Sequence, residues 1–425
     1  MEHCRQSDRK VSPMGMGLWE RLFSIVPLRP RRKGKNHAEY FQGLCRALDD
    51  AGVSKPTLVV DRNRLDKNIE LLKRSVGTRF DYRIVAKSLP SIALLKYVME
   101  QTSTKRLMIF HQPFLNEVAK AIPDADVLMG KPMPVAAARN FYEGHAADGG
   151  FNAGEQLQWL IDTADRLRQY QALAHEAKVS MKINIELDIG LHRGGVSDDQ
   201  ELIEMLDLIE SDPYLSLSGF MGYEVHIAKV PGNKLVARNK AMAIYEDMVA
   251  LAERHLGRGL RHLTLNGAGS PTYKYYESGA FPINEVAAGS CLVKPSDFDL
   301  VTLVDHVPAA FIATPVLKAL TKTELPGVEW LGKLMSLWNP NREKAFFTYG
   351  GYWKANPISP EGLIINPLFG RSTNQEMYNG SSDIDLKADD WVFFRPTQSE
   401  SVFLQFEDIA VCEDGRIEQW WPVLN

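Results

Sequence analysis

Short strand-like runs alternate with amphipathic helical stretches through most of this chain, from about residue 57 to residue 305. A strand followed by a helix, repeated many times, is typical of a parallel sheet, because each helix carries the chain back to the start of the next strand. Helical patterns lie at residues 162–175, 197–209 and 239–256. The candidate strands are 57–60, 82–86, 106–110, 126–129, 158–161, 182–188, 219–225, 262–266 and 284–288. Their number predicts an α/β protein built on a closed (β/α)8 barrel, with the first strand free to belong to another domain.

The pattern changes after residue 307, where short strand-like runs follow one another without helical intervals. Gly, Pro, Asn or Asp bounds each run, as expected for antiparallel strands joined by turns. The expected strands are 311–319, 344–349, 363–365, 391–395, 402–405 and 409–412, and residues 323–343 form an insertion between two of them. We therefore divide the chain into an N-terminal extension and helix (1–54), a barrel (55–306) and a C-terminal antiparallel β domain (307–425).

Composition narrows the classes of function. With 425 residues, 45% of them hydrophobic, the chain can bury a barrel core and a second domain. A net charge of -4 gives no reason to expect a nucleic-acid or anionic-membrane partner, and no apolar run approaches the length of a membrane span. The four cysteines lie far apart and form no CxxC pair, which indicates thiols of a reducing compartment, and we predict a cytoplasmic location. The role of residues 1–40 is left open.

One lysine, Lys87, directly follows the expected strand at residues 82–86. A lysine at the mouth of a barrel strand, among apolar neighbours, can lose its proton and attack a carbonyl carbon as an amine nucleophile. Taken alone, Lys87 is more simply a solvated lysine at the start of a helix. The motifs that follow decide between these interpretations.

Three further motifs occur in order along the chain. They are Asp188-Ile-Gly-Leu-His-Arg-Gly-Gly, Gly222-Tyr-Glu-Val-His and Asn266-Gly-Ala-Gly-Ser-Pro-Thr. In kind, order and separation these motifs resemble those of the alanine-racemase-like (fold type III) enzymes that use pyridoxal 5'-phosphate. The branch they resemble most contains D-threonine aldolase and D-serine dehydratase. The resemblance runs from about residue 57 to the C-terminus, and it is more specific for fold and cofactor than for the reaction.

The resemblance implies roles for a lysine and an arginine. Lys87 would form the Schiff base with the cofactor, because Arg83 and Lys87 match the family's Arg-Pro-His-x-Lys segment, although the Pro-His pair is missing. Arg193 would lie against the phenolic oxygen of the cofactor, as the arginine of the family's Asp-x-Gly-x-x-Arg-x-Gly motif does. The structural alternative for Arg193 is an ion pair with Asp188 across the turn.

Tyr223 and His226 correspond to the family's Tyr-x-Gly-His pattern, with valine in place of glycine. We expect Tyr223 to contact the cofactor. His226 could orient the cofactor ring or transfer a proton, and a half-buried structural histidine with its hydrogen bonds satisfied is an equally good interpretation.

The resemblance also implies a phosphate site. The family's Gly-Gly-Thr-Gly-Thr-type loop corresponds here to Asn266, Gly267, Gly269 and Ser270, where glycine lets backbone N–H groups approach a phosphate closely. A second turn near the phosphate would be Gly289-Ser290, which is followed by cysteine where the family usually has tyrosine.

The largest departure from the family lies near the C-terminus. The relatives carry His and Cys or Asp there as ligands of a divalent metal, whereas this chain has Gln398 and Glu400. Tyr378 likewise follows a segment that lacks the family's histidine. Glutamine is a poor zinc ligand and a single carboxylate is a weak site for a hard cation, so we expect no bound metal and, specifically, no zinc. Glu400 would then be free for acid–base chemistry, or would simply pair with Arg395.

These observations predict a pyridoxal-phosphate-dependent lyase or aldolase that breaks a bond at Cα of a small, D-configured amino acid, with Lys87 as the base. A racemase of the same fold is the alternative, with Tyr378 or His226 as a base on the opposite face. An interpretation from another class of function is a non-catalytic pyridoxal-phosphate carrier or regulator. The presence of the second domain argues against this interpretation. The resemblance also implies a homodimer.

Overall fold

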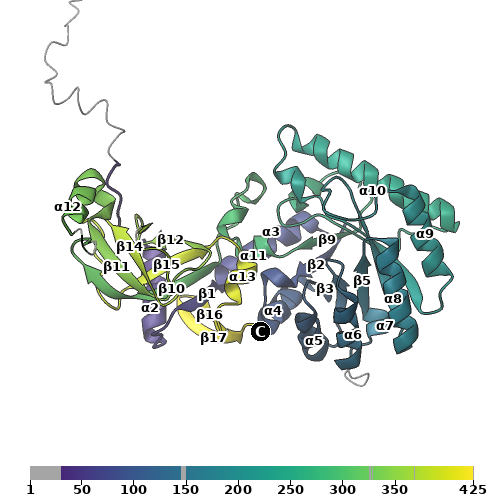
Figure 1. Cartoon of the computed structure of the whole chain (residues 1–425), viewed down its shortest axis with the longest axis horizontal. Coiled ribbons are helices and arrows are strands. Elements are labelled where there is room, and N and C mark those ends of the chain that lie inside the picture. The colour runs from purple at the N-terminus through teal and green to yellow at the C-terminus, as the bar shows by residue number, and fades with distance from the viewer. Residues whose placement is uncertain (1–29, 145–149, 325–326, 328, 368, 425) are drawn as a thin grey trace, which may run out of the picture.

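The computed structural model describes residues 30–144, 150–324, 327, 329–367 and 369–424 (Figure 1). Most of the N-terminal extension, residues 1–29, therefore lies outside the described residues. The chain forms two lobes, a barrel surrounded by helices and a β domain beside it. Within the described residues, no helix combines the length and the apolar composition that crossing a membrane requires.

Eight parallel strands close into the barrel, and β2 pairs with both β3 and β9. The strands are β2 (Asp81–Val85), β3 (Arg106–Ile109), β4 (Asp126–Met129), β5 (Leu157–Ile161), β6 (Met181–Leu187), β7 (Leu215–Gly222), β8 (Thr264–Gly267) and β9 (Glu285–Ala288). The predicted (β/α)8 barrel is confirmed. The carboxyl ends of all eight strands meet at one end of the barrel, which is where such folds carry their sites.

Helices surround the barrel, and polar side chains begin several of them. Asp61, Ser91, Thr163, Asp198 and Asn233 each accept a hydrogen bond from a backbone N–H of the first turn that follows. The helices are α3 (Arg62–Val76), α4 (Ile92–Thr102), α5 (Gln112–Ala121), α6 (Val135–Gly144), α7 (Ala153–Gln156), α8 (Ala164–Ala177), α9 (Asp199–Glu210), α10 (Lys234–Leu256) and α11 (Ser290–Val293). The helices expected at 162–175, 197–209 and 239–256 correspond to α8, α9 and α10, and α10 begins five residues earlier than expected.

The second domain is a largely antiparallel sheet in the order β13-β14-β11-β10-β1-β16-β17, in which β15 also pairs with β10, and β12 pairs with β15. Its strands are β1 (Thr57–Asp61), β10 (Ala310–Leu320), β11 (Lys344–Tyr349), β12 (Ala355–Ser359), β13 (Ile364–Ile365), β14 (Gln375–Gly380), β15 (Trp391–Pro396), β16 (Asp408–Glu413) and β17 (Arg416–Pro422). The predicted antiparallel β domain is confirmed. The strand at 57–60 belongs to this sheet, the placement that the sequence left open, and α2 (Glu39–Asp50) packs on it through Leu44 and Leu48.

The sequence prediction differs from the structure at residues 402–405, where the expected strand is instead the end of α13 (Ser399–Phe403) and a turn. Val402 and Phe403 are both fully buried, and so short an apolar run fits a helix as well as a strand. The expected insertion between two strands contains α12 (Glu329–Trp338). The sequence prediction also omitted β14 and β17, because both strands have polar sequences.

A charged layer lies inside the barrel below the strand ends. Arg83 is fully buried, and its Nε and Nη2 donate to the two carboxylate oxygens of Glu285 at 2.6 and 2.9 Å. Its Nη1 donates to Asp126 Oδ1 at 2.9 Å. Burial acts against the charge of Arg83, but these two carboxylates outweigh it and raise the pKa of the guanidinium.

Candidate active site

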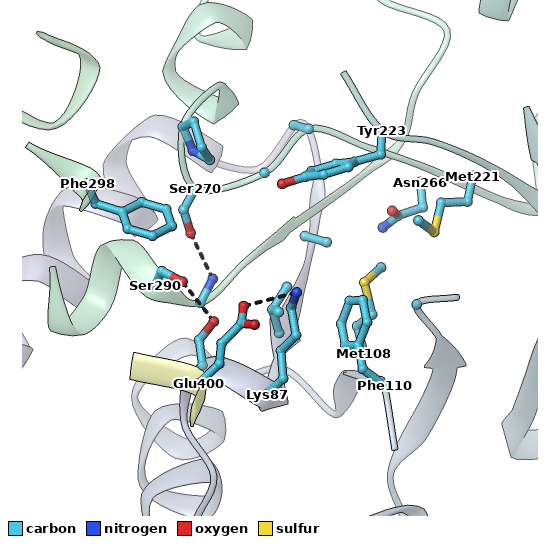
Figure 2. Close-up of a pocket in the computed structure, with 18 of the residues that line it drawn as sticks. Lys87, Met108, Phe110, Met221, Tyr223, Asn266, Ser270, Ser290, Phe298 and Glu400 are labelled. Atoms are coloured by element: carbon cyan, nitrogen blue, oxygen red, sulfur yellow. Dashed lines mark hydrogen bonds and ion pairs between the residues drawn. The ribbon is translucent and has the colours of Figure 1, made fainter. Parts of the chain in front are cut away.

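A pocket opens at the carboxyl ends of the barrel strands and extends to the β domain (Figure 2). Residues from several strand ends and from both domains converge on it. The predicted residues that line it are Lys87, Arg193, Tyr223, Asn266, Gly269, Ser270, Gly289, Ser290 and Glu400. Segments that are hundreds of residues apart in the sequence thus form one chemical environment.

Lys87 lies in the short turn Ala86–Ser88 that follows β2. Its Nζ is 3.0 Å from Glu400 Oε1 and 4.3 Å from the centroid of the Phe110 ring (Figure 2). The ring has room there because residue 130 is glycine, and a Cβ at that position would overlap the far edge of the Phe110 ring. The amine is therefore fixed between a carboxylate and an aromatic face.

Glu400 comes from α13 of the β domain, and a neighbouring segment anchors it to the barrel lobe. Arg395 donates to Asp299 Oδ1 at 2.7 Å and to the carbonyl of Lys294 at 3.0 Å. Arg395 is thus engaged elsewhere, so Glu400 pairs with Lys87 rather than with Arg395, the alternative that the sequence allowed. Gln398 accepts from Lys354 Nζ at 2.6 Å and does not line the pocket.

The turn after β6 presents Arg193 to the pocket. Asp188 accepts from the backbone N–H groups of Gly190 and His192, both at 3.0 Å, and its other oxygen lies 2.8 Å from His192 Nδ1. Burial raises the pKa of Asp188, but these hydrogen bonds outweigh it and lower the pKa. Asp188 therefore shapes the turn instead of pairing with Arg193, whose guanidinium carbon lies 5.3 Å from the centroid of the Tyr223 ring.

Tyr223 follows β7 and lies across the pocket from Lys87 (Figure 2). Burial, together with the nearby charge of Glu224, raises the pKa of Tyr223 to about 12. The ring packs on Gly269, where a Cβ would lie 2.8 Å from Tyr223 Cε2. Residue 269 therefore has to be glycine if the ring is to keep this position.

His226 does not line the pocket, which corrects its expected placement at the reacting centre. It lies in the turn Val225–Ala228, with Nε2 close to Gly190. Its Nδ1 is buried and finds no hydrogen-bond partner among the described residues, and burial lowers the pKa of the ring. The half-buried position agrees with the structural interpretation of His226, but the unpartnered Nδ1 does not agree with the full set of hydrogen bonds which that interpretation expects.

Tyr378 is also away from the pocket. It lies in β14 inside the β domain, only 1% exposed, and its hydroxyl donates to Glu376 at 2.6 Å. Its ring packs against Phe394 with the centroids 5.1 Å apart. The polar strand β14 was not recognised in the sequence, so the direction of this tyrosine could not be foreseen.

Hydroxyl and backbone donors gather at one end of the pocket. The backbone N–H groups of Gly289 and Cys291 both donate to Ser270 Oγ at 3.1 Å, so two donors converge on one point. Ser88 Oγ and Ser290 Oγ lie 2.8 Å apart beside them. Such a set of donors suits the oxygens of an anion.

Asn266 and Gly267 were also expected at the phosphate loop, and their contacts differ from that expectation. Gly267 lies off the pocket, and its Cβ would be 2.8 Å from Ile283 Cγ2, so glycine is needed there for packing. Asn266 lines the pocket and donates to Glu285 Oε1 at 2.8 Å, which links the pocket to Arg83 and the charged layer below.

Several residues of the pocket were missed in the sequence. Ser88 directly follows Lys87, and its hydroxyl at a strand end was a usable signal. Phe298 reaches the pocket from the segment that leaves the barrel, for which the sequence carried no signal. Glu186 lines the outer mouth with Asp162, and burial, together with the charge of Asp162, raises its pKa to about 7.

Within the part of the chain that the structure describes, no cluster of three or more His, Cys, Asp or Glu side chains is arranged to hold a metal ion.

Comparison with known proteins places this geometry in context. A family model described as "Alanine racemase, N-terminal domain" matches residues 60–297, more than half of the chain. No curated protein matches this chain.

Similar solved structures include D-threonine aldolase from Filomicrobium marinum, with a TM-score of 0.67 and 15% identity over 88% of this chain and 96% of that one. D-threo-3-hydroxyaspartate dehydratase from Delftia sp. HT23 has a TM-score of 0.69 and 13% identity over 88% and 98%. Alanine racemase from Bacillus anthracis has a TM-score of 0.66 and 14% identity over 87% and 98%. These likenesses span nearly the whole of each structure and show a shared fold.

Proposed function

This chain belongs to the alanine racemase N-terminal domain family, and from that membership we propose that it is a pyridoxal-phosphate-dependent lyase acting at Cα of a D-configured amino acid. The observation that carries the proposal is the convergence of Lys87, Arg193, Tyr223 and a set of hydroxyl and N–H donors on one pocket. The two similar structures named as an aldolase and a dehydratase support lyase chemistry.

The residues present fit this cofactor. Ser270 and Ser290 supply uncharged hydroxyl donors for a phosphate, and the N–H groups of Gly289 and Cys291 hold the Ser270 hydroxyl oxygen so that its proton can be donated. Lys87 supplies the amine at the opposite part of the pocket, and Tyr223 supplies a flat aromatic surface. When bound, pyridoxal phosphate withdraws electrons from Cα of an attached amino acid.

The residues of the pocket would then have separate roles in the reaction. Lys87 Nζ would accept or return the proton at Cα, and Glu400, 3.0 Å away, would hold that amine in place and stabilise its charged form. Arg193 would supply positive charge on the other side of the pocket, near the ring of Tyr223.

Racemisation requires proton-carrying groups on both faces of the substrate carbon. Neither Tyr378 nor His226, the two groups considered for the second face, lines the pocket. We therefore favour the lyase over the racemase. The homodimer and the cytoplasmic location stay predictions.

The direct test is to supply purified protein with pyridoxal phosphate and then with single amino acids of both configurations. We expect an aldehyde or a keto acid from β-hydroxy D-amino acids and neither product from the L-forms. Formation of the opposite enantiomer as the sole product would establish a racemase instead. Cofactor binding without turnover of any amino acid would favour a carrier or regulator.

Activity should not depend on a divalent metal. Gln398 and Glu400 stand where the resembled enzymes place metal ligands, and in the structure they bind Lys354 and Lys87 instead. Protein treated with a chelator and dialysed should keep its turnover rate within about twofold, and elemental analysis should find well under one zinc per chain. Loss of activity on chelation, restored by zinc or manganese, would contradict this expectation.

A further inference from the structure

The residue after Tyr223, Glu224, is a fully buried carboxylate that takes no part in the chemistry proposed above. It is 0% exposed, two residues after the end of β7, and no Lys, Arg or His side chain among the described residues forms an ion pair with it. Burying a carboxylate without a cation is costly unless hydrogen-bond donors surround it. The groups that donate hydrogen bonds to Glu224 therefore indicate its role.

Besides Tyr276, which also lies against this carboxylate, the donors belong to the loop at residues 268–272, which borders the pocket. The backbone N–H of Ala268 donates to Glu224 Oε2 at 3.2 Å, and the hydroxyl of Thr272 donates to Oε1 at 2.7 Å. Thr272 Oγ1 in turn accepts from the N–H of Gly269 at 3.0 Å. One carboxylate thus holds both ends of the loop.

The conformation of the loop needs this support. Ala268 has φ of 60°, in the left-handed region that a residue with a Cβ rarely adopts. The bond to Glu224 fixes that residue, and the Tyr223 ring packs on Gly269 next to it. Ser270 follows at once, with its hydroxyl at the point where the N–H groups of Gly289 and Cys291 converge.

We propose that Glu224 is a positioning residue that sets the loop at residues 268–272 as the seat of the cofactor's phosphate group. It turns the N–H groups of Ala268 and Gly269 away from the pocket and leaves Ser270 facing it. Because Tyr223 is its neighbour in the chain, the same short segment also aligns the aromatic surface with the phosphate seat. The inference rests on the proposed cofactor.

The charge of Glu224 is compatible with an anion nearby. Burial raises its pKa, although the hydrogen bonds from Thr272 and Ala268 oppose the shift. A carboxyl group that gives up its negative charge more readily repels a neighbouring phosphate less.

The test compares the affinities for pyridoxal 5'-phosphate and for pyridoxal, which lacks the phosphate. The Kd for pyridoxal divided by the Kd for pyridoxal phosphate, both measured by absorbance titration, isolates the contribution of the phosphate seat. Glu224→Ala and Thr272→Val should each reduce this ratio about tenfold or more, because each leaves loop donors unpaired. Glu224→Gln keeps one acceptor oxygen in place, so its Kd ratio should lie between that of the wild type and that of Glu224→Ala.

Asp212→Asn is the matched control. Asp212 is also buried, lies before the other end of β7, and accepts from Tyr214 N, Gln171 Nε2 and His175 Nε2 at 2.8, 2.8 and 2.6 Å. This variant should lower the Tm and leave the ratio unchanged, which separates a general loss of stability from a loss of the phosphate seat.

The outcomes distinguish this inference from the proposed function. If the wild type binds pyridoxal phosphate no better than pyridoxal, both are overturned. If the wild type prefers the phosphate and Thr272→Val and Glu224→Ala keep that preference in full, the role of Glu224 alone is overturned. Should Glu224→Ala fail to fold, Thr272→Val and Glu224→Gln decide the question.

Discussion

Replacing Lys87 by alanine should abolish covalent retention of pyridoxal phosphate and slow turnover by about 10²–10⁴-fold, the range that a positioned acid–base group contributes. Lys87 is the lysine that lies in the pocket beside Glu400, at 3.0 Å, with Phe110 covering its amine. Borohydride reduction of wild-type protein loaded with the cofactor, followed by peptide mass spectrometry, should place the pyridoxyl group on Lys87.

Lys105→Ala provides the control for this experiment. Lys105 precedes β3 at the far end of the barrel and pairs with Asp124 at 2.8 Å, so its removal should leave the labelling of Lys87 intact. A pyridoxyl group on Lys131, which lines the outer mouth of the pocket, would refute the assignment. So would full labelling of the Lys87→Ala variant.

Arg83→Met should lower the free energy of unfolding by about 3–5 kcal/mol, because it removes the one fully buried cation beside Glu285 and leaves that buried carboxylate with only the partly exposed Arg106 as a charged partner. Arg83 and Glu285 are both fully buried and joined by two hydrogen bonds at 2.6 and 2.9 Å. Urea denaturation followed by circular dichroism would measure the loss. The double variant Arg83→Met/Glu285→Leu should recover much of it, since no charge then stays buried alone.

Arg106→Met is the comparison variant for the charged layer. Arg106 also bonds Glu285, at 2.9 Å, but about a third of its side chain is exposed, so solvent screens the pair and the expected loss is smaller. Equal losses for Arg83→Met and Arg106→Met would show that burial does not control the energetics of this layer.

The barrel could be predicted closely from the sequence because its strands are buried on both faces and appear as short continuous apolar runs. The predicted strand at 126–129 has the bounds of β4, and most others differ by one or two residues. The sheet strands β14 and β17 carry Glu376, Asn379 and Gln419, whose polarity concealed them. Periodicity could not separate a strand from a helix at Val402 and Phe403, where both side chains are buried.

The site was predictable where it depends on strand ends, since in a barrel these meet at one place. Lys87 was singled out by its place after a strand, the resemblance to the family's motifs implied Arg193, Tyr223 and Ser270, and all four line the pocket. Roles that depend on tertiary contacts could not be predicted from the sequence. Glu224 was visible in its motif, but no spacing indicated that its carboxylate would reach Ala268 and Thr272.

The position of β1 has a consequence for how this protein is made. β1 lies between β10 and β16, so the first strand of the described residues is an inner strand of a sheet whose other strands are synthesised after the barrel. At roughly 5–20 residues per second, synthesis holds that strand without its neighbours for tens of seconds while the barrel emerges and folds. Glu400 arrives still later, near the end of the chain. A nascent chain would therefore carry a folded barrel in which Lys87 still lacks its partner Glu400.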